Sequence, residues 1–140
     1  MSITFHPDFR MVLMCDFNSG FQPPEMVKKR PVVVVSPKRN NSQLCTVVPL
    51  SSVVPLPIES HHHRLDPMSL PGSLRHVETW AKCDMVTTVS LARLDRVADG
   101  RGPGNVRKYV TVKISEEDFS SIRKGILSAV GLNCLTPYVP

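Results

Sequence analysis

Three consecutive cations, Lys28, Lys29 and Arg30, stand directly before a run of four valines at 32–35. The valines are bounded by prolines and predict a short β-strand that is buried on both faces. An arginine at the entrance to a rigid, buried strand can aim its planar guanidinium at a phosphate group. Taken alone, these residues also fit a solvated basic loop before a core strand, and that is the simpler interpretation. The rest of the chain has to decide between the two.

The adjacent histidines at 61–63 and the four cysteines are the other groups that could carry chemistry. Neighbouring side chains on an extended segment point to opposite faces, so the three histidines cannot all bind one metal ion. We expect exposed loop residues here, with a metal or proton-transfer role as the less favoured alternative. The cysteines form no CxxC pair, and no HExxH, GxSxG or nucleotide-binding glycine pattern occurs. We therefore expect reduced, mostly buried thiols, no metal centre and no cofactor.

Charge, length and hydropathy restrict the class of protein. Seventeen Lys and Arg against twelve Asp and Glu give a net charge of +5, which permits a polyanionic partner without requiring one. The 140 residues fit one domain, 1–140, that buries its own core. The apolar fraction is 41 %, and no run approaches the roughly 20 apolar residues of a membrane span. Residues 1–9, expected as a loose arm, lack the features of a signal peptide, so we expect a cytoplasmic protein that does not enter a membrane.

Short β-strands are the elements expected to position these residues. Met11–Phe17 predicts a first strand, and Leu44–Leu50 predicts a hairpin-like partner for the valine strand. Val77–Leu91 returns to β-type residues, and the period-two alternation of Lys108–Ile114 predicts a half-buried strand. The segment 53–72 contains four prolines and is expected as a long irregular loop. Loops of this length are usually functional or mobile.

The strongest helix signal covers residues 115–131. Ser115 can cap the helix, and Asp118, three residues later, can complete a capping box. Gly131 then ends the helix. The expected apolar face consists of Phe119, Ile122, Ile126, Leu127 and Val130. About five short strands with one C-terminal helix predict a mainly β, α+β fold built on a small, strongly bent sheet or barrel.

Two blocks of the chain resemble signature sequences of the MazF/PemK (Kid) family, the toxins of type II toxin–antitoxin systems. These blocks are Arg30–Pro37, an arginine that enters a strand, and Val47–Ser52. Glu25 lies where the family has an acidic loop residue, and Lys-Cys-Asp at 82–84 resembles the Arg-Cys-Asp of the PemK/Kid branch. The predicted C-terminal helix is similar to the family's closing helix. The resemblance extends over residues 11–132 and depends on the order and spacing of the blocks together.

The resemblance implies both a fold and an activity. The fold is an SH3-like β-barrel of the MazF/PemK/CcdB type with a C-terminal helix, usually assembled as a homodimer. The activity is metal-independent cleavage of single-stranded RNA, typically messenger RNA at a short sequence. The substrate's own 2′-OH attacks the adjacent phosphorus, so the site needs a base, an acid and a cation rather than a nucleophilic side chain. A cognate antitoxin protein is the expected partner besides RNA.

Four residues match catalytic positions of the family. Arg30 matches the arginine that binds and stabilises the scissile phosphate. Ser51, where most members have threonine, can donate to a phosphate oxygen. Asp84 matches the aspartate proposed as general base in the PemK/Kid branch, and Glu25 matches the acidic loop residue. The substrate-binding candidates are Lys28, Lys29, Ser52 and Lys82.

Two departures from the family pattern leave alternatives open. Lys82 replaces the branch's arginine, which keeps the charge but loses the planar fork, and Pro24 lies near the place of the branch's loop histidine. The first hypothesis is an endoribonuclease toxin. The alternatives are a gyrase-poison-like binding barrel of the same superfamily and a catalytically inactive barrel that binds RNA. Each candidate also has a structural alternative: an ion pair for Glu25, a turn for Ser51, a strand-end cap for Asp84 and solvated charge for Lys82.

Overall fold

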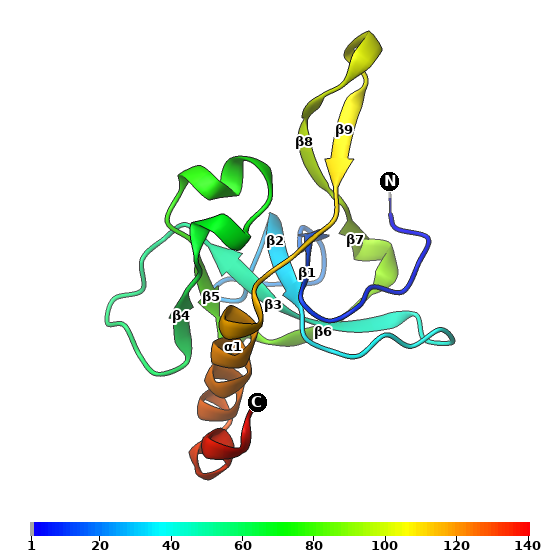
Figure 1. Cartoon of the computed structure of the whole chain (residues 1–140). Helices are drawn as coiled ribbons and strands as arrows, with labels where there is room; N and C mark the ends of the chain where they lie inside the picture. The colour runs from blue at the N-terminus through cyan, green and yellow to red at the C-terminus, as the bar shows by residue number, and fades with distance from the viewer. Residues whose placement is uncertain (1) are drawn as a thin grey trace.

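A strongly bent antiparallel sheet and one C-terminal helix dominate the molecule, of which the computed structural model describes residues 2–140 (Figure 1). The strands are β1 (Met11–Asp16), β2 (Lys29–Val34), β3 (Leu44–Ser51), β4 (His62–Arg64), β5 (Trp80–Lys82), β6 (Thr87–Ser90), β7 (Leu94–Asp95), β8 (Val97–Arg101), β9 (Arg107–Val110) and β10 (Val112–Lys113). The helix is α1 (Glu116–Ala129). Short 3₁₀ turns are η1 (Pro67–Ser69), η2 (Gly72–His76), η3 (Cys83–Met85), η4 (Leu91–Arg93), η5 (Pro103–Asn105) and η6 (Asn133–Tyr138). The expected mainly β fold with a C-terminal helix is confirmed.

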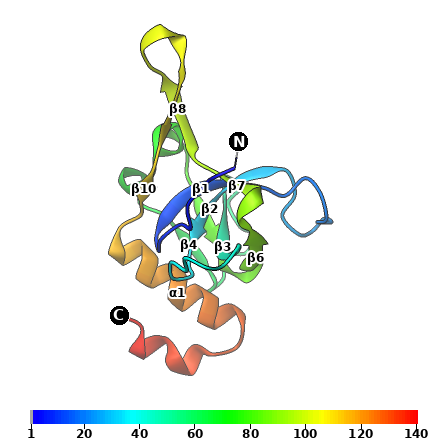
Figure 2. The same cartoon turned by 90° about the vertical axis from the view of Figure 1, so that its right-hand side faces the viewer.

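The main sheet has the strand order β10-β1-β2-β3-β5-β4, with β6 paired to β3 and β7 paired to β1. The expected hairpin-like pair of valine strand and following strand is present as β2–β3, where Val33 lies opposite Val48. Among the described strands the ladder does not close into a complete barrel, because β6 and β7 are joined by η4 rather than paired. β8 and β9 form a separate hairpin that projects at the top of Figure 1. α1 lies at the opposite end, with the C-terminal segment beside it (Figure 2).

The valine strand β2 is buried on both faces, as predicted, because the sheet has a core on each side. Val33 packs in a cluster with Phe119 and Ile122 of α1. Val32 and Val34 belong to a second cluster, to which β6, η4 and β7 contribute. Alternate residues of a strand point to opposite faces, so one strand serves both clusters. Val32, Val33 and Val34 are fully buried, whereas Val35, part of the predicted strand, follows β2 and is half-buried. β2 is therefore a rigid base for Lys29 and Arg30, which begin the same strand.

Helix α1 begins and ends where the sequence predicts. The Asp118 backbone N–H donates to the Ser115 hydroxyl at 3.1 Å, and Gly131 adopts a φ of +80° just after the helix. The capping box is not completed, because the Asp118 carboxylate contacts His63 of β4 at 2.8 Å instead. The predicted apolar face is also wrong at its end, where Val130 is exposed. No helix in the described part of the chain, α1 included, is long and apolar enough to cross a membrane.

Residues 2–9, predicted as a loose arm, are tied to the sheet. The Ile3 N–H donates to the Leu94 carbonyl at 3.0 Å. The Arg39 N–H donates to the His6 Nδ1 at 3.1 Å, and the opposite ring nitrogen lies 2.9 Å from the Leu44 carbonyl oxygen. The His6 ring therefore bridges two backbone groups and is buried. Backbone hydrogen bonds order this segment although its sequence has no clear periodicity.

Three other segments differ from the sequence prediction. The excursion 53–72 is not wholly irregular, because it contains β4 and η1. The β-type residues 77–91 form two strands, β5 and β6, separated by η3, and 108–114 divides at Thr111 between β9 and β10. Composition indicates strand-forming residues but does not show where the chain leaves one ladder and joins another. The turn η3 carries Asp84, one of the site residues predicted from the sequence.

Candidate functional site

Arg30 lies near the start of β2, at the edge of the β2–β3 ladder. Val32 is opposite Pro49 in the antiparallel register, and the same register carried two residues further sets Arg30 against Ser51. The Arg30 Nε donates to the Val27 carbonyl at 3.3 Å. In the described part of the chain no carboxylate pairs with this half-buried guanidinium. Arg30 therefore retains donors that an anion could use.

The Ser51 hydroxyl is buried and keeps its own proton available. Ser51 is 8 % exposed, and its Oγ accepts a hydrogen bond from the Val53 backbone N–H at 3.1 Å. A hydroxyl that accepts one bond can still donate, so Ser51 can serve both the turn and the site. Ser52, the next residue, is exposed. Ser51 also pairs with the buried Trp80 of β5, and β5 leads along the chain to η3.

The turn η3 is fixed between α1 and the start of β4. A Cβ atom on Gly125 of α1 would lie 2.7 Å from the Cys83 Sγ, so glycine permits this close approach. The Cys83 backbone N–H donates to the His61 carbonyl at 3.1 Å. Burial raises the pKa of the Cys83 thiol to about 12, so this cysteine packs rather than reacts. Asp84, the next residue, is exposed on a turn that neighbouring elements hold in place.

Asp84 belongs to the wall between two hollows. The first, the Glu25 hollow, has a volume of about 290 Å³, and the second, the Lys82 hollow, about 360 Å³. Asp84 and Met85 line both. The Glu25 hollow is also lined by Phe21, Pro24, Glu25, Met26, Val86 and Thr87, and the Lys82 hollow by Pro55, Leu56, Pro57, Glu59, His61, His62 and Lys82. An extended ligand that crosses Asp84 thus has a recess on each side.

The predicted catalytic residues fall into two groups. Asp84 shares one hollow with Glu25 and the other with Lys82. Arg30 and Ser51 share the neighbouring ends of β2 and β3. Neither Arg30 nor Ser51 lines either hollow. The structure therefore assembles a candidate base with its recesses and a candidate phosphate contact, on separate features of the surface.

Glu25 and Lys28 lie in the loop before β2, and Lys29 is the first residue of that strand. The Gln22 backbone N–H donates to the Glu25 carboxylate at 2.7 Å, so this carboxylate supports a turn, and within the described residues it does not form the ion pair considered as its alternative role. Lys28 has a φ of +71°, and its carbonyl accepts a hydrogen bond from the Phe17 N–H at 2.9 Å. Lys28 and Lys29 are both exposed. Their side chains add positive charge beside Arg30.

His61 and His62 join Asp84 in the Lys82 hollow, a contact that sequence reasoning missed. The His61 Nε2 lies 3.5 Å from the Asp84 Oδ2, and its Nδ1 lies 3.7 Å from the Glu59 Oε2. The centroids of the two imidazole rings are 4.3 Å apart. The expectation of exposed loop histidines is wrong, because His61 lies in a turn and His62 begins β4, where both are half-buried. The run of three histidines is conspicuous in the sequence, but no local pattern links it to Asp84, which lies on a different element.

This cluster has the donor types of a zinc site, but its hydrogen bonds do not fit one. One donor atom from each of His61, His62 and Asp84 lies within 4.8 Å of the others, and imidazole and carboxylate are common zinc ligands. The His62 Nδ1, however, accepts a hydrogen bond from the Glu59 backbone N–H at 3.0 Å, so the neutral ring carries its proton on Nε2. Burial and the adjacent His61 lower the pKa of His62, which favours that neutral form. His62 therefore has no free lone pair for a metal in this arrangement.

The third histidine of the run has a structural role. The His63 Nε2 lies 2.8 Å from the Asp118 Oδ1 of α1. The Asp118 Oδ2 accepts hydrogen bonds from the Asp66 N–H at 3.2 Å and the Ser69 hydroxyl at 2.9 Å. Asp118 is buried, and a buried carboxylate needs such partners. This network ties β4 and η1 to α1 and so fixes the segment that presents His61.

Comparison with known sequences identifies the family. Residues 9–129 match the family described as PemK-like, MazF-like toxin of type II toxin–antitoxin system. YifN of Escherichia coli (strain K12) is 28 % identical, and the match covers 93 % of this chain and 95 % of YifN. A protein of Haemophilus influenzae is 29 % identical, with 96 % and 98 % covered. Neither name states an activity.

Solved structures share the fold at low sequence identity. MazF from Deinococcus radiodurans has a TM-score of 0.62 at 16 % identity and covers 91 % of this chain and 98 % of its own. The Mycobacterium tuberculosis toxin MazF-mt6 has a TM-score of 0.61 at 15 % identity, with 88 % and 98 % covered. A mycobacterial endoribonuclease solved with its cognate antitoxin has a TM-score of 0.60 at 17 % identity, with 90 % and 96 % covered. The family match spans most of the sequence, and the fold agrees with it, so the chain belongs to the PemK-like, MazF-like toxins of type II toxin–antitoxin systems.

Proposed function

We propose that this toxin is an endoribonuclease that cleaves single-stranded RNA, typically messenger RNA at a short sequence, without a metal ion. The observation that carries the proposal is the state of Arg30. It is half-buried at the entrance to β2, donates to the Val27 carbonyl, and has no carboxylate partner among the described residues. Partial removal of a cation from water without a counter-ion costs free energy. An RNA phosphate supplies that counter-ion, and arginine binds phosphate oxygens in a bidentate manner.

The proposed reaction uses the RNA's own 2′-OH as the nucleophile. Asp84 accepts the 2′-OH proton as general base, the 2′-oxygen bonds to phosphorus, and the 5′-oxygen leaves, which gives a cyclic phosphate and a 5′-OH end. Arg30 and the Ser51 hydroxyl stabilise the charge of the phosphorane. Lys82 adds a cation on one side of Asp84, and Glu25 lines the recess on the other. The remaining proposed contacts to the RNA backbone are Lys28, Lys29 and Ser52.

An antitoxin and a second copy of the chain complete the proposal. Relatives solved as complexes, MazE–MazF from Deinococcus radiodurans and the mycobacterial enzyme with its cognate antitoxin, support a protein inhibitor for this toxin. The net charge of +5 suits an acidic, largely disordered antitoxin segment that competes with RNA. Exposed Leu132, Leu135 and Tyr138 leave an apolar patch that a homodimer would cover. We place the toxin in the cytoplasm, where messenger RNA is translated.

The test is RNA cleavage in EDTA followed by mapping of the new 5′ ends. Purified protein is incubated with mixed RNA, and the Arg30→Ala variant serves as the matched control. The proposal expects cuts at a short recurring sequence that leave 5′-OH ends, and it expects no cuts by the variant. Intact RNA with the wild-type protein would contradict the proposal, as would equal cleavage by Arg30→Ala.

One observation favours a second candidate, a barrel that binds RNA without cutting it. Arg30 and Ser51 line neither of the hollows that flank Asp84, so the phosphate contact and the candidate base lie on separate features. A protein of this kind would retain RNA in a filter-binding assay and would lose affinity as salt is added, because counterions compete for the phosphates. The RNA would remain intact in the cleavage assay.

A further inference from the structure

We propose that His61 is the general acid of the cleavage reaction and acts as a pair with Asp84, an inference that rests on the proposed function. Metal-free cleavage needs a base for the 2′-OH and an acid for the leaving 5′-oxygen. In-line attack puts these two oxygens on opposite sides of phosphorus, so Asp84 cannot serve both at once. The His61 Nε2 lies 3.5 Å from the Asp84 Oδ2. This contact leaves the other carboxylate oxygen and the His61 Nδ1 for the two ends of the reaction.

The backbone of His61 is held in place by three elements. Its carbonyl accepts a hydrogen bond from the Cys83 N–H of η3 at 3.1 Å. The His62 N–H donates to the Glu59 carbonyl at 3.0 Å, and the Glu59 N–H donates to the His62 Nδ1 at 3.0 Å, so the turn that contains His61 is closed twice. The His61 carbonyl oxygen would lie 3.4 Å from a Cβ atom on Gly125 of α1. A side chain on a turn fixed in this way is preorganised for proton transfer.

Charged groups face His61 from both sides of the Lys82 hollow. The Asp84 and Glu59 carboxylates lie 3.5 Å and 3.7 Å from its two ring nitrogens. His62 stands beside it with a pKa lowered by burial and by His61, Lys82 lines the same hollow, and α1 contributes an uncharged glycine. An imidazolium between two carboxylates is not an unpaired charge. Both distances exceed those of a hydrogen bond, so its protons remain available to a substrate.

The proton balance of one turnover closes between the His61–Asp84 pair and solvent water. The 2′-O–H bond breaks as Asp84 takes the proton, the 2′-oxygen bonds to phosphorus, and the P–O5′ bond breaks. Its electron pair stays on the 5′-oxygen, which takes a proton from the His61 imidazolium. Asp84 is then protonated and His61 is neutral. Asp84 then gives its proton to solvent water, and the His61 Nδ1 takes one proton from solvent water, so both groups return to their starting states and no metal enters the reaction.

An RNA substrate with sulfur in place of the bridging 5′-oxygen distinguishes a missing acid from a damaged site. A thiolate leaves without protonation, because a thiol is far more acidic than an alcohol. The substitution is made at the scissile position that 5′-end mapping identifies. On ordinary RNA, His61→Ala should lose about 10²–10⁴-fold in cleavage rate, the usual contribution of general acid–base catalysis. On the sulfur substrate it should cleave at close to the wild-type rate, whereas Asp84→Asn should remain slow on both.

Two further variants complete the experiment. His61→Gln keeps a polar side chain and tests the proposal if the alanine variant does not fold. His76→Gln removes an exposed histidine of η2 and should behave as wild type on both substrates. Wild-type cleavage of ordinary RNA by the His61 variants would overturn the proposal. So would an equal loss on the two substrates, which would make His61 structural. A wild-type protein that cuts neither substrate would instead refute the proposed endoribonuclease function.

Discussion

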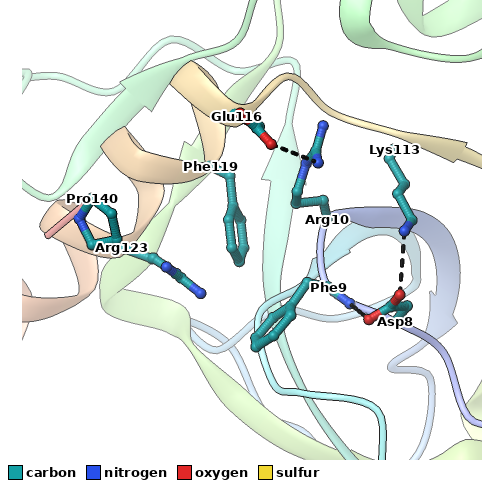
Figure 3. A pocket seen from close by; sticks show the side chains of 8 residues that line it. All are labelled: Asp8, Phe9, Arg10, Lys113, Glu116, Phe119, Arg123 and Pro140. Carbon is teal, nitrogen blue, oxygen red and sulfur yellow. Dashed lines mark hydrogen bonds and ion pairs between the residues drawn. The ribbon is translucent and has the colours of Figure 1, made fainter.

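Two regions of the molecule carry clustered cations, and they differ in what those cations already bind. The first is a hollow of about 400 Å³ between α1 and the chain that enters β1 (Figure 3). There the Arg10 Nε donates to the Ile114 carbonyl at 2.9 Å, and the guanidinium lies 3.7 Å from Glu116. Lys113 donates to Asp8 at 3.2 Å. These cations are paired by the fold itself.

The second region consists of Arg30 with the neighbouring Lys28 and Lys29. It differs most clearly from the hollow of Figure 3 when Arg30 is compared with Arg123, another arginine of that hollow. The Arg123 guanidinium stacks over the rings of Phe119 and Phe9, at 4.3 Å and 5.2 Å from their centroids. Arg30 has one backbone carbonyl partner at 3.3 Å and neither a ring contact nor a carboxylate among the described residues. Volume and charge alone therefore do not distinguish a structural hollow from a binding site. We expect hydrogen-bond donors that the fold leaves unused, such as those of Arg30, to make that distinction.

The largest expected effect comes from removing the unused donors. Arg30→Ala should lower the rate of RNA cleavage by a factor on the order of 10² or more, because charge on the phosphorane loses its fixed partner. Arg30→Lys should restore only part of the rate, since an ammonium group cannot bridge two phosphate oxygens. Cleavage is measured on a labelled single-stranded RNA, and urea unfolding checks that the fold is intact. A normal rate for Arg30→Ala would remove the distinction between the two regions.

A change in α1 should affect the Asp84 region without touching an ionisable group. Gly125→Ala adds a methyl group 2.7 Å from the Cys83 Sγ. The gain in helix propensity is about 1 kcal/mol, and overpacking typically costs about 1–3 kcal/mol, so we expect a net loss of up to about 2 kcal/mol in the free energy of unfolding. Cleavage should also slow, because η3 carries Asp84. Urea unfolding and the RNA assay measure the two effects.

The matched control for this variant removes the atom that the methyl group would meet. Combined with Cys83→Ala, the Gly125→Ala change should cost less than the sum of the two single changes, because contacting residues are not additive. Additive losses, or a stabilised Gly125→Ala protein, would show that the close approach is not what sets the position of η3.

A smaller effect is expected in the hollow of Figure 3. Arg123→Ala removes two cation–π contacts, each contributing about 0.5–1 kcal/mol at exposed sites. We expect a loss of about 1 kcal/mol in unfolding free energy and an RNA cleavage rate equal to that of wild type. If Arg123→Ala instead kept its stability and lost RNA cleavage, the expectation would be wrong and this hollow would be part of the functional site.

The smallest effects concern pH, and the hollow of Figure 3 and the Lys82 hollow should lose stability in different pH ranges. The Phe9 backbone N–H and Lys113 lower the pKa of Asp8, so the stability that this carboxylate contributes is lost as pH falls below about 4 toward its folded pKa. Burial lowers the pKa of His62, so its neutral form is favoured in the folded state and stability falls as pH decreases through about 6.5. Asp8→Asn should remove the first dependence and His62→Gln the second. The urea midpoint is measured across pH, and profiles that coincide with wild type would contradict both assignments.

Local sequence signals predicted the parts of the fold that depend on neighbours in the chain. The valines of β2, the Ser115 cap and the Gly131 end of α1 follow from burial periodicity and capping chemistry. Three of the four cysteines are buried and free, as expected from their spacing. The ordering of residues 2–9 was not predictable, because it depends on the His6 ring meeting backbone groups of distant segments. The breaks that divide residues 77–91 and 108–114 into separate strands could not be predicted from composition either.

The candidate site also has residues that local sequence predicts and a contact that depends on distant parts of the chain. Arg30, Ser51 and Asp84 are marked by sequence blocks, since each block keeps its order and spacing. The contact between His61 and Asp84 is not marked by any pattern, because it arises from the pairing of β4 with β5 and from the close packing of α1 on η3. The rule that adjacent strand side chains diverge was correct for His63, which turns to α1. His61 and His62 lie together because His61 precedes the strand, and the expectation that the three histidines cannot share one ion holds.

The wall that Asp84 and Met85 form between the two hollows bears on the shape of RNA that the toxin can use. In the proposed reaction, a strand that presents a 2′-OH to Asp84 has a nucleotide over each recess, so the wall would separate two neighbouring bases that otherwise stack. In a duplex this parting also breaks base pairs, at a cost of a few kcal/mol. In an unpaired loop there are no base pairs to break and the bases stack less, so the same separation costs less free energy. Under the proposed function, we therefore expect the wall to favour flexible, unpaired segments of messenger RNA, independently of their base sequence.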